Sequence, residues 1–278
     1  MKGDLRTGAC EMDRSDQLEN IDGEYLASEI SRLRAAYLDL MCDSLVGRLN
    51  RDPAIQPHIG GYDENHRLNG WDWPSVAPSM IGARRMRHLR AECERVISGG
   101  VAGDFLEAGV WRGGAAMMMR AALKAYGVTD RRVIAADTFD GQPLDTDPED
   151  SAAFLREEPV FAVPLYEVRA TFERYGLLDR QVVFLEGPFA ETLANAPVER
   201  LAILRLDGDT FSSARDTLAA LYDKLSPGGS VILDDYYLFE DNRRAVDIFR
   251  AEREIVDPIV GIDDYGGYWV KERRSTAC

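Results

Sequence analysis

The sequence is poor in positive charge. Its 278 residues include 33 lysines and arginines against 48 aspartates and glutamates, which gives a net charge of −15. A nucleic-acid-binding protein needs a basic face to neutralise phosphates, and a protein that docks on an anionic membrane needs a basic patch. We therefore expect neither nucleic acid nor a membrane among the partners of this chain.

Long apolar runs and clustered cysteines are also missing. No run approaches the roughly 20 residues that a membrane-spanning helix needs. Cys10, Cys42, Cys93 and Cys278 lie far apart and form no CxxC pair, which argues against a structural zinc site or a disulfide framework. Residues 1–24 lack the apolar core of a signal peptide and are predicted to form a mobile acidic arm. A soluble, reduced, cytoplasmic protein is the expectation.

Two helical patterns follow the arm. Apolar residues recur at helical spacing over Tyr25–Arg48 and again over Ser79–Ser98. Between them, residues 52–78 are rich in proline, glycine and tryptophan and show no sustained periodicity. Irregular segments of this length are often functional. We predict a helical cover that contains a substrate loop, with Trp71 and Trp73 as candidates to line a pocket.

Short apolar runs then alternate with helical segments. Strands are predicted at Asp104–Ala108, Val133–Ala136, Val182–Leu185, Leu201–Leu206 and Ser230–Leu233, and helices at Ala115–Tyr126, Leu165–Tyr175, Thr210–Leu225 and Asn242–Arg253. This alternation predicts an α/β fold with a mainly parallel central sheet and helices on both faces. Acids and prolines in residues 140–164 interrupt it and indicate a mobile lid. The predicted parts are the arm (1–24), the helical cover with the substrate loop (25–100) and the core (101–274).

A glycine-rich turn follows the first predicted strand. Gly109 and Gly113 within it allow the backbone to approach a ligand closely. The order of the glycines is GxxxGG rather than the GxGxxG of dinucleotide sites, which favours a nucleoside without phosphates, such as S-adenosylmethionine. Asp137 ends the second strand, where a carboxylate can accept hydrogen bonds from both ribose hydroxyls. The alternatives are a ligand-free turn and an aspartate that only forms a turn or caps a helix.

Two further stretches are candidates for the cofactor site. Gly187 and Phe189 follow the third predicted strand, where an adenine could lie against the backbone and the ring. A buried core aromatic is the alternative for Phe189. Thr138, directly after Asp137, completes the candidate set.

Acidic side chains follow the fourth and fifth predicted strands. Asp207 and Asp209 come after the fourth, and Asp234 and Asp235 after the fifth. Carboxylates that meet at one sheet edge repel each other unless a cation balances them. Oxygen ligands without histidine or cysteine favour Mg²⁺, with Ca²⁺ or Mn²⁺ as alternatives. Turn-forming and solvated acids are the other interpretation of these aspartates.

The general base is expected among the same acids. Histidine is the usual candidate, but His58, His66 and His88 all precede the predicted sheet. Asp207 is therefore the preferred proton acceptor, and a histidine of the cover loop is the alternative.

Several motifs resemble the macrocin O-methyltransferase family. They are Tyr37-Leu-Asp-Leu-Met41, Asp72-Trp-Pro74, Met80-Ile-Gly-Ala-Arg-Arg85, Glu107 to Gly114 (EAGVWRGG), Lys124 to Asp130, Ala136 to Gly141 (ADTFDG), Arg174 to Leu178, Arg205 to Asp209 (RLDGD), and Leu225 to Gly229 with Asp234 to Tyr236. The resemblance spans about Tyr25 to Lys271. It implies a Rossmann-like class I methyltransferase fold and, by association, a dimer or larger homo-oligomer.

The resemblance also implies the roles of individual residues. It places Glu107, Gly109 and Asp137 in an S-adenosylmethionine site. It places Asp207, Asp234 and Asp235 in a magnesium site, with Asp207 also as proton acceptor.

The leading hypothesis is a magnesium-dependent O-methyltransferase of antibiotic biosynthesis. It would methylate a hydroxyl group on a deoxysugar of a natural-product glycoside. Asp207 would receive the proton, and the lid would exclude water during in-line transfer. One alternative is methylation of a non-sugar hydroxyl of a secondary metabolite. Another is a nucleotide-linked oxidoreductase, which the missing GxGxxG disfavours. The third is a catalytically silent assembly subunit, which has no need of a repulsive acid cluster.

Overall fold

The computed structural model describes residues 14–56, 60–142, 147 and 149–272, and it divides into two compact units. The first unit, Met1–Tyr37, contains residues 14–37 of helix α1 (Arg14–Leu45), and the last turns of α1 belong to the second unit, Leu38–Cys278. Helix α1 thus begins at Arg14, within the predicted arm over residues 1–24, whereas the sequence pattern predicted a helix from Tyr25. Residues 14–24 contain no proline and several good helix formers, so they continue the helical pattern upstream. Residues 1–13 lie outside the described part.

The second unit is built on a seven-stranded sheet in the order β5-β4-β3-β6-β7-β9-β8. The strands are β3 (Asp104–Ala108), β4 (Val133–Asp137), β5 (Val182–Glu186), β6 (Leu201–Leu206), β7 (Leu225–Leu233), β8 (Val260–Gly261) and β9 (Gly267–Val270). Strands β3 to β7 are parallel, and β8 and β9 add an antiparallel edge to β7. The predicted α/β fold with a mainly parallel sheet is confirmed, whereas the antiparallel edge was not predicted.

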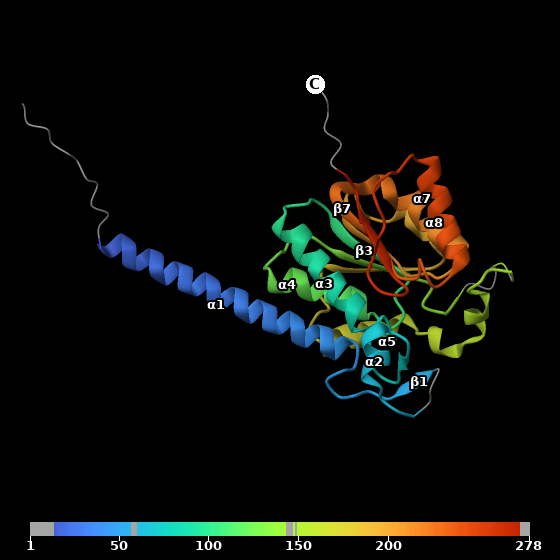
Figure 1. The fold of residues 1–278 in the computed structure, drawn as a ribbon, viewed down its shortest axis with the longest axis horizontal. Coiled ribbons are helices and arrows are strands. Elements are labelled where there is room, and N and C mark those ends of the chain that lie inside the picture. Colours follow the sequence, from blue (N-terminus) through green and yellow to red (C-terminus); the bar gives the residue numbers. More distant parts are fainter. Residues whose placement is uncertain (1–13, 57–59, 143–146, 148, 273–278) are drawn as a thin grey trace, which may run out of the picture. The chain divides into compact units, whose positions relative to one another are not determined.

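Helices cover both faces of this sheet. They are α3 (Gly82–Ser98), α4 (Gly114–Ala125), α5 (Leu165–Arg174), the short α6 (Phe189–Thr192), α7 (Phe211–Leu221) and α8 (Glu240–Glu252). The sheet lies between α3 and α4 on one side and α7 and α8 on the other (Figure 1). A core that includes Leu204, Leu218 and Trp269 is fully buried between the sheet and α7 and α8. Strands covered on both faces are apolar throughout, which is why β6 has an almost continuous apolar sequence.

Residues 52–78 are more regular than the sequence suggested. They form a small hairpin of β1 (Ala54–Gln56) and β2 (Trp73–Pro74) around helix α2 (Glu64–Asn69). Arg67 is buried at its centre and donates to Asp72 at 2.8 Å and to the carbonyl oxygen of Val46 at 2.9 Å. The segment is thus organised by a buried ion pair, which leaves no hydrophobic periodicity to detect in the sequence.

The strand order identifies the edge of the sheet at which a ligand is expected to bind. The chain runs outward from β3 through β4 to β5 and then returns to β6 on the other side of β3. In such sheets ligands bind where the strand order reverses, beyond the carboxyl ends of the strands. Ala108 is paired with Leu206, and Leu206 with Leu233, so the residues after β3, β6 and β7 lie side by side.

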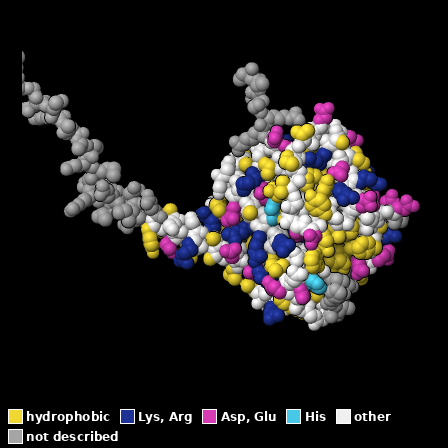
Figure 2. Space-filling model, in the orientation of Figure 1, with side chains coloured by type: hydrophobic (Ala, Val, Ile, Leu, Met, Phe, Trp, Pro, Cys, Tyr) yellow, Lys and Arg dark blue, Asp and Glu magenta, His cyan; other side chains and the backbone are white. Residues whose placement is uncertain are grey.

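Charge of both signs is spread over the surface. Acidic and basic side chains are interspersed on the face shown in Figure 2. Among the helices that the structure describes, none is both long enough and apolar enough to cross a membrane.

Candidate active site

The glycine turn after β3 lies directly against the loop after β6. Gly109 has φ of +95°, a conformation that favours glycine. A Cβ atom at this position would lie 1.9 Å from the carbonyl oxygen of Asp207. The sequence predicts that Gly109 lets the backbone approach a ligand closely. In the structure, the backbone at Gly109 also lies close to the loop that carries Asp207.

Asp137, at the end of β4, holds this turn in place. Its Oδ2 accepts a hydrogen bond from the backbone N–H of Val110 at 2.6 Å, and its Oδ1 accepts one from Phe139 at 2.9 Å. Burial raises the pKa of Asp137, and these backbone donors offset part of the effect. The carboxylate thus has a structural role in addition to the ribose contact predicted for it.

Three carboxylates converge at the ends of β6 and β7. Asp207, Asp234 and Asp235 each offer an oxygen within 4.8 Å of the others. Asp235 Oδ2 is buried and has no hydrogen-bond partner among the described residues. Burial raises the pKa of Asp207 to about 6 and that of Asp235 well above its usual value, and neighbouring aspartates add to both shifts. A set of oxygen donors with one unpaired oxygen fits a hard divalent cation.

Asp209 lies beside this group. It has φ of +65°, and its Oδ2 accepts a hydrogen bond from Gln142 Nε2 at 2.7 Å. Burial and the charge of Asp207 raise the pKa of Asp209 to about 8. Gln142 was not singled out in the sequence, because its partner is distant along the chain.

Two buried arginines, also missed from the sequence, balance these acids. Arg205 donates from Nη1 to Asp207 Oδ2 at 2.5 Å and pairs through Nη2 with Asp234. Arg85, from α3, pairs with Asp234 and lies 3.2 Å from Asp263. A signal for Arg205 was present in the sequence. It is the single charged residue within the apolar strand β6, and a buried charge requires a partner.

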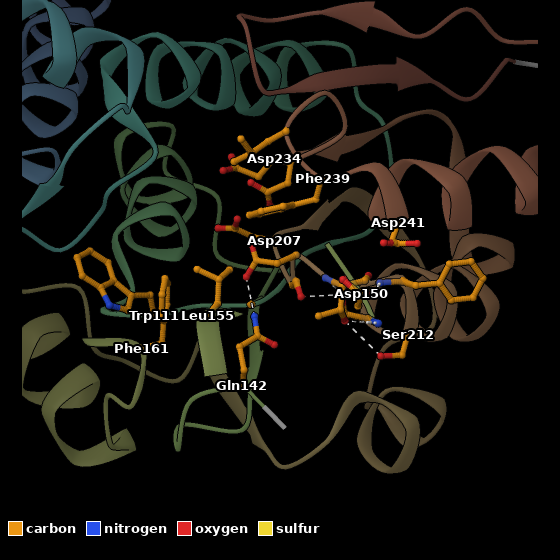
Figure 3. A pocket seen from close by; sticks show the side chains of 18 of the residues that line it. Trp111, Gln142, Asp150, Leu155, Phe161, Asp207, Ser212, Asp234, Phe239 and Asp241 are labelled. Carbon is orange, nitrogen blue, oxygen red and sulfur yellow. Dashed lines mark hydrogen bonds between the residues drawn. The ribbon is translucent and has the colours of Figure 1, made fainter. Parts of the chain in front are cut away.

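A cavity of about 1070 Å³ opens over these loops. Single small-molecule sites have about 300–1,000 Å³, so there is room for a cofactor together with an acceptor. Asp207 lies between Trp111 and Phe161 on one side and Asp150 and Ser212 on the other (Figure 3).

Most of the predicted site residues line the cavity. Those that do are Gly109, Asp137, Thr138, Phe189, Asp207, Asp209, Asp234 and Asp235, together with Trp71 and Trp73 of the cover. Three predicted cofactor residues, Glu107, Gly113 and Gly187, are not among its lining residues, nor are His66 and His88 in the described chain. His58 lies outside the described residues.

Glu107 and Gly113, two of the three predicted residues away from the wall, have different surroundings. Glu107 is buried in β3, where its Oε1 accepts a hydrogen bond from Arg205 at 2.6 Å, and its Oε2 has no hydrogen-bond partner in the described part. Gly113 precedes α4 with φ of +92°, and a side chain there would meet Phe172 and Val168. Gly113 therefore has a packing role.

One wall of the cavity is apolar and comes from the described part of the predicted lid. The 3-10 turns η1 (Ala153–Glu157) and η2 (Pro159–Phe161) bring Leu155 and Phe161 to the cavity. Phe161 packs edge-on against Trp73 of the cover with ring centroids 5.1 Å apart. Apolar side chains and a carboxylate cluster in one cavity suit a ligand with one hydroxylated and one hydrophobic part.

Two hydrogen bonds attach this segment to the helices behind the acids. Asp150 accepts from the backbone N–H of Phe211, at the start of α7, at 2.8 Å. The N–H of Ser151 donates to Asp241, in the first turn of α8, at 2.8 Å. The wall is thereby held against the start of α7 and of α8.

Known proteins are similar in sequence to this chain over nearly its whole length. The family model for macrocin-O-methyltransferase matches residues 23–271. The chain is 49% identical over 242 residues to the 8-demethyl-8-(2,3-dimethoxy-alpha-L-rhamnosyl)-tetracenomycin-C 4'-O-methyltransferase of Streptomyces olivaceus, which covers 85% of this chain and 92% of that protein. It is 44% identical to the demethyldecarbamoylnovobiocin O-methyltransferase of Streptomyces niveus, over 89% of this chain and 97% of that protein.

A solved structure has the same fold. The O-methyltransferase NovP superposes with a TM-score of 0.83 and is 45% identical, covering 86% of this chain and all of that chain. This chain is thus an O-methyltransferase and belongs to the macrocin-O-methyltransferase family.

Proposed function

We propose that this enzyme transfers a methyl group from S-adenosylmethionine to a sugar hydroxyl of a natural-product glycoside, with the help of a divalent cation. The observation that carries the proposal is the meeting of the Gly109 turn and three carboxylates in one cavity at the switch point of the sheet. The Streptomyces olivaceus relative is a 4'-O-methyltransferase of a rhamnosyl tetracenomycin, which supports a sugar as acceptor.

The cofactor would lie at the carboxyl ends of β3 and β4. Gly109 leaves room for it, and Asp137, Thr138 and Phe189 line the cavity beside the turn. Glu107 would act from beneath the cavity wall through its unpaired Oε2, and Gly187 would help to shape the turn before Phe189.

Asp207, Asp234 and Asp235 would hold the cation, and we propose Mg²⁺ because all three ligands are carboxylates. A bound divalent cation lowers the pKa of a neighbouring hydroxyl and orients it. Asp207 would receive the hydroxyl proton. Its side chain is 23% exposed, the most accessible of the three, so it is the best placed to meet a hydroxyl in the cavity.

The acceptor would enter along the apolar wall. Trp73, Leu155 and Phe161 would contact the hydrophobic part of the glycoside, and its sugar would face Asp207. Residues 140–164 would act as the lid that excludes water, and residues 143–146 and 148 of this segment lie outside the described part.

We also propose a homodimer formed through α1. Leu26, Ile30, Leu33 and Leu40 are all exposed, and their spacing of four, three and seven residues is that of the a and d positions of a coiled coil. A second copy of α1 offers the same apolar stripe, and dimers with twofold symmetry use identical surfaces.

The free thiols of Cys42 and Cys93 support a reducing, cytoplasmic location.

Mass spectrometry tests the reaction. The protein is incubated with S-adenosylmethionine, Mg²⁺ and a panel of demethylated glycosides and their aglycones, and a gain of about 14 Da, one CH₂, is sought. Methylation of glycosides alone supports the proposal, whereas methylation of aglycones identifies a non-sugar hydroxyl as the target. If S-adenosylhomocysteine fails to bind in calorimetry and no acceptor is methylated, the chain is a silent subunit.

A further inference from the structure

One arginine is shared by the two halves of the proposed site. Arg205 lies in β6 and is 1% exposed. Its Nη1 donates to Glu107 Oε1 at 2.6 Å and to Asp207 Oδ2 at 2.5 Å, and its Nη2 pairs with Asp234. Glu107 belongs to the cofactor half and the two aspartates to the cation half. A single guanidinium therefore contacts carboxylates of both halves.

A second buried arginine provides the comparison. Arg85 is 5% exposed and pairs with Asp234 and Asp263. Neither partner belongs to the cofactor half. Both are buried guanidinium groups that pair with Asp234. Arg205 also reaches Glu107, whereas Arg85 reaches Asp263 and itself lines the cavity.

The planar guanidinium explains how one residue can orient three carboxylates. Its N–H groups point in fixed directions, so each acid that accepts from them is held at a defined angle. Carboxylates that lie close together in a buried environment would otherwise turn away from one another. A lysine carries the same charge on a single nitrogen and cannot maintain this geometry for all three acids.

We propose that Arg205 is a positioning residue that orients Glu107 toward the cofactor and, at the same time, Asp207 and Asp234 toward the divalent cation. This inference rests on the proposed function, because it assumes that both ligands bind. Loss of the Arg205 guanidinium then weakens both sites together, although Arg205 touches neither ligand. Loss of Arg85 weakens the cation site alone.

Calorimetry on the full chain tests this with two probes, S-adenosylhomocysteine and Mn²⁺, titrated separately. For Arg205→Lys we expect the affinity for each probe to fall at least tenfold. For the matched control Arg85→Lys we expect at least a fivefold loss for Mn²⁺ and a change of less than twofold for S-adenosylhomocysteine. Near-ultraviolet circular dichroism verifies that each variant is folded.

Other outcomes overturn the inference. They are an Arg205→Lys variant that loses affinity for one probe only, and an Arg85→Lys variant that loses affinity for both to the same extent. If the wild-type protein binds neither probe, the proposed function itself fails, so the two failures are distinguishable.

A second pair of variants covers the case in which Arg205→Lys does not fold. Glu107→Gln removes the negative charge that Arg205 contacts in the cofactor half. Asp137→Asn removes the charge of a nearby buried carboxylate that has other partners. We expect Mn²⁺ affinity to change at least threefold in Glu107→Gln and less than twofold in Asp137→Asn. Equal changes in the two variants overturn the inference.

Discussion

Gly109 and Asp207 are in contact through their backbones. A Cβ atom at position 109 would lie 1.9 Å from the carbonyl oxygen of Asp207, and φ of Gly109 is +95°. The turn proposed to face the cofactor and the loop that carries the first proposed cation ligand therefore fit together only because position 109 has no side chain.

Gly109→Ala should disrupt both loops. Positive φ in a non-glycine residue costs about 1–3 kcal/mol, and displacement of the Asp207 loop adds to this cost. We expect the variant to lose more than about 3 kcal/mol in urea unfolding and to bind S-adenosylhomocysteine at least tenfold more weakly. Gly127→Ala is the control, because Gly127 also has positive φ (+67°) but nothing lies within 4 Å of its Cβ position. Equal losses in the two variants would contradict the steric argument.

Asp235→Asn should remove cation binding while the cofactor still binds. The unpaired Oδ2 of Asp235 is the oxygen best placed to gain a ligand, and an amide is a much weaker ligand for Mg²⁺. Mn²⁺ affinity is expected to fall at least tenfold and turnover to be lost. Asp223→Asn, on the surface, serves as control. Full turnover of wild-type protein in EDTA would rule out a role for the cation.

Without a divalent cation, the stability that the buried acids Asp209 and Glu107 contribute should decrease as pH rises from about 4.5 to about 8 and then level off. Burial raises the pKa of Asp209 from 3.8 to about 8 and that of Glu107 from 4.5 to about 8. Between these values the folded state holds protons that the unfolded chain has released, so each rise in pH favours unfolding.

Thermal unfolding in EDTA across this pH range measures the effect. Mg²⁺ should restore stability most strongly at the alkaline end, because protons compete with the cation for the same carboxylates. Asp209→Asn should flatten the profile. A melting temperature that rises with pH in EDTA would refute the prediction.

Substitution of the apolar stripe on α1 should produce monomers. Ile30→Asp together with Leu33→Asp places charges in the middle of the proposed coiled coil. Analytical ultracentrifugation should show half the wild-type mass, with the melting of the second unit unchanged. Ser28→Asp, on the same helix but off the stripe, should leave the mass as in wild type. A wild-type protein that sediments as a monomer would remove this proposal.

The central strands could be predicted because their own sequences contain the signal. Asp104–Ala108 and Leu201–Leu206 were predicted with the bounds that the structure has, since buried parallel strands are short apolar runs between polar turns. The edge strands were missed for the opposite reason. Gly267–Val270 has four residues, two of them buried, and is a strand because β7 offers it an edge. That information lies in the tertiary structure.

The site was predicted where it depends on the ends of strands and missed where it depends on side chains that meet from distant segments. Asp207, Asp234 and Asp235 follow strands, and strand order brings them together. The partner of Arg85 is 149 residues away, and that of Gln142 is 67 residues away. No local pattern connects such pairs.

The pairing of Arg85 with Asp234 has a consequence for engineering the acceptor range. Helix α3 lies in the cover, yet its arginine neutralises an acid of the catalytic core. A chimera that exchanges the cover between relatives thus also exchanges part of the charge balance at the proposed cation site. Grafts confined to residues 153–161, which carry the apolar wall, leave Arg85 in its native place, and they are the more promising units of recombination for new acceptors.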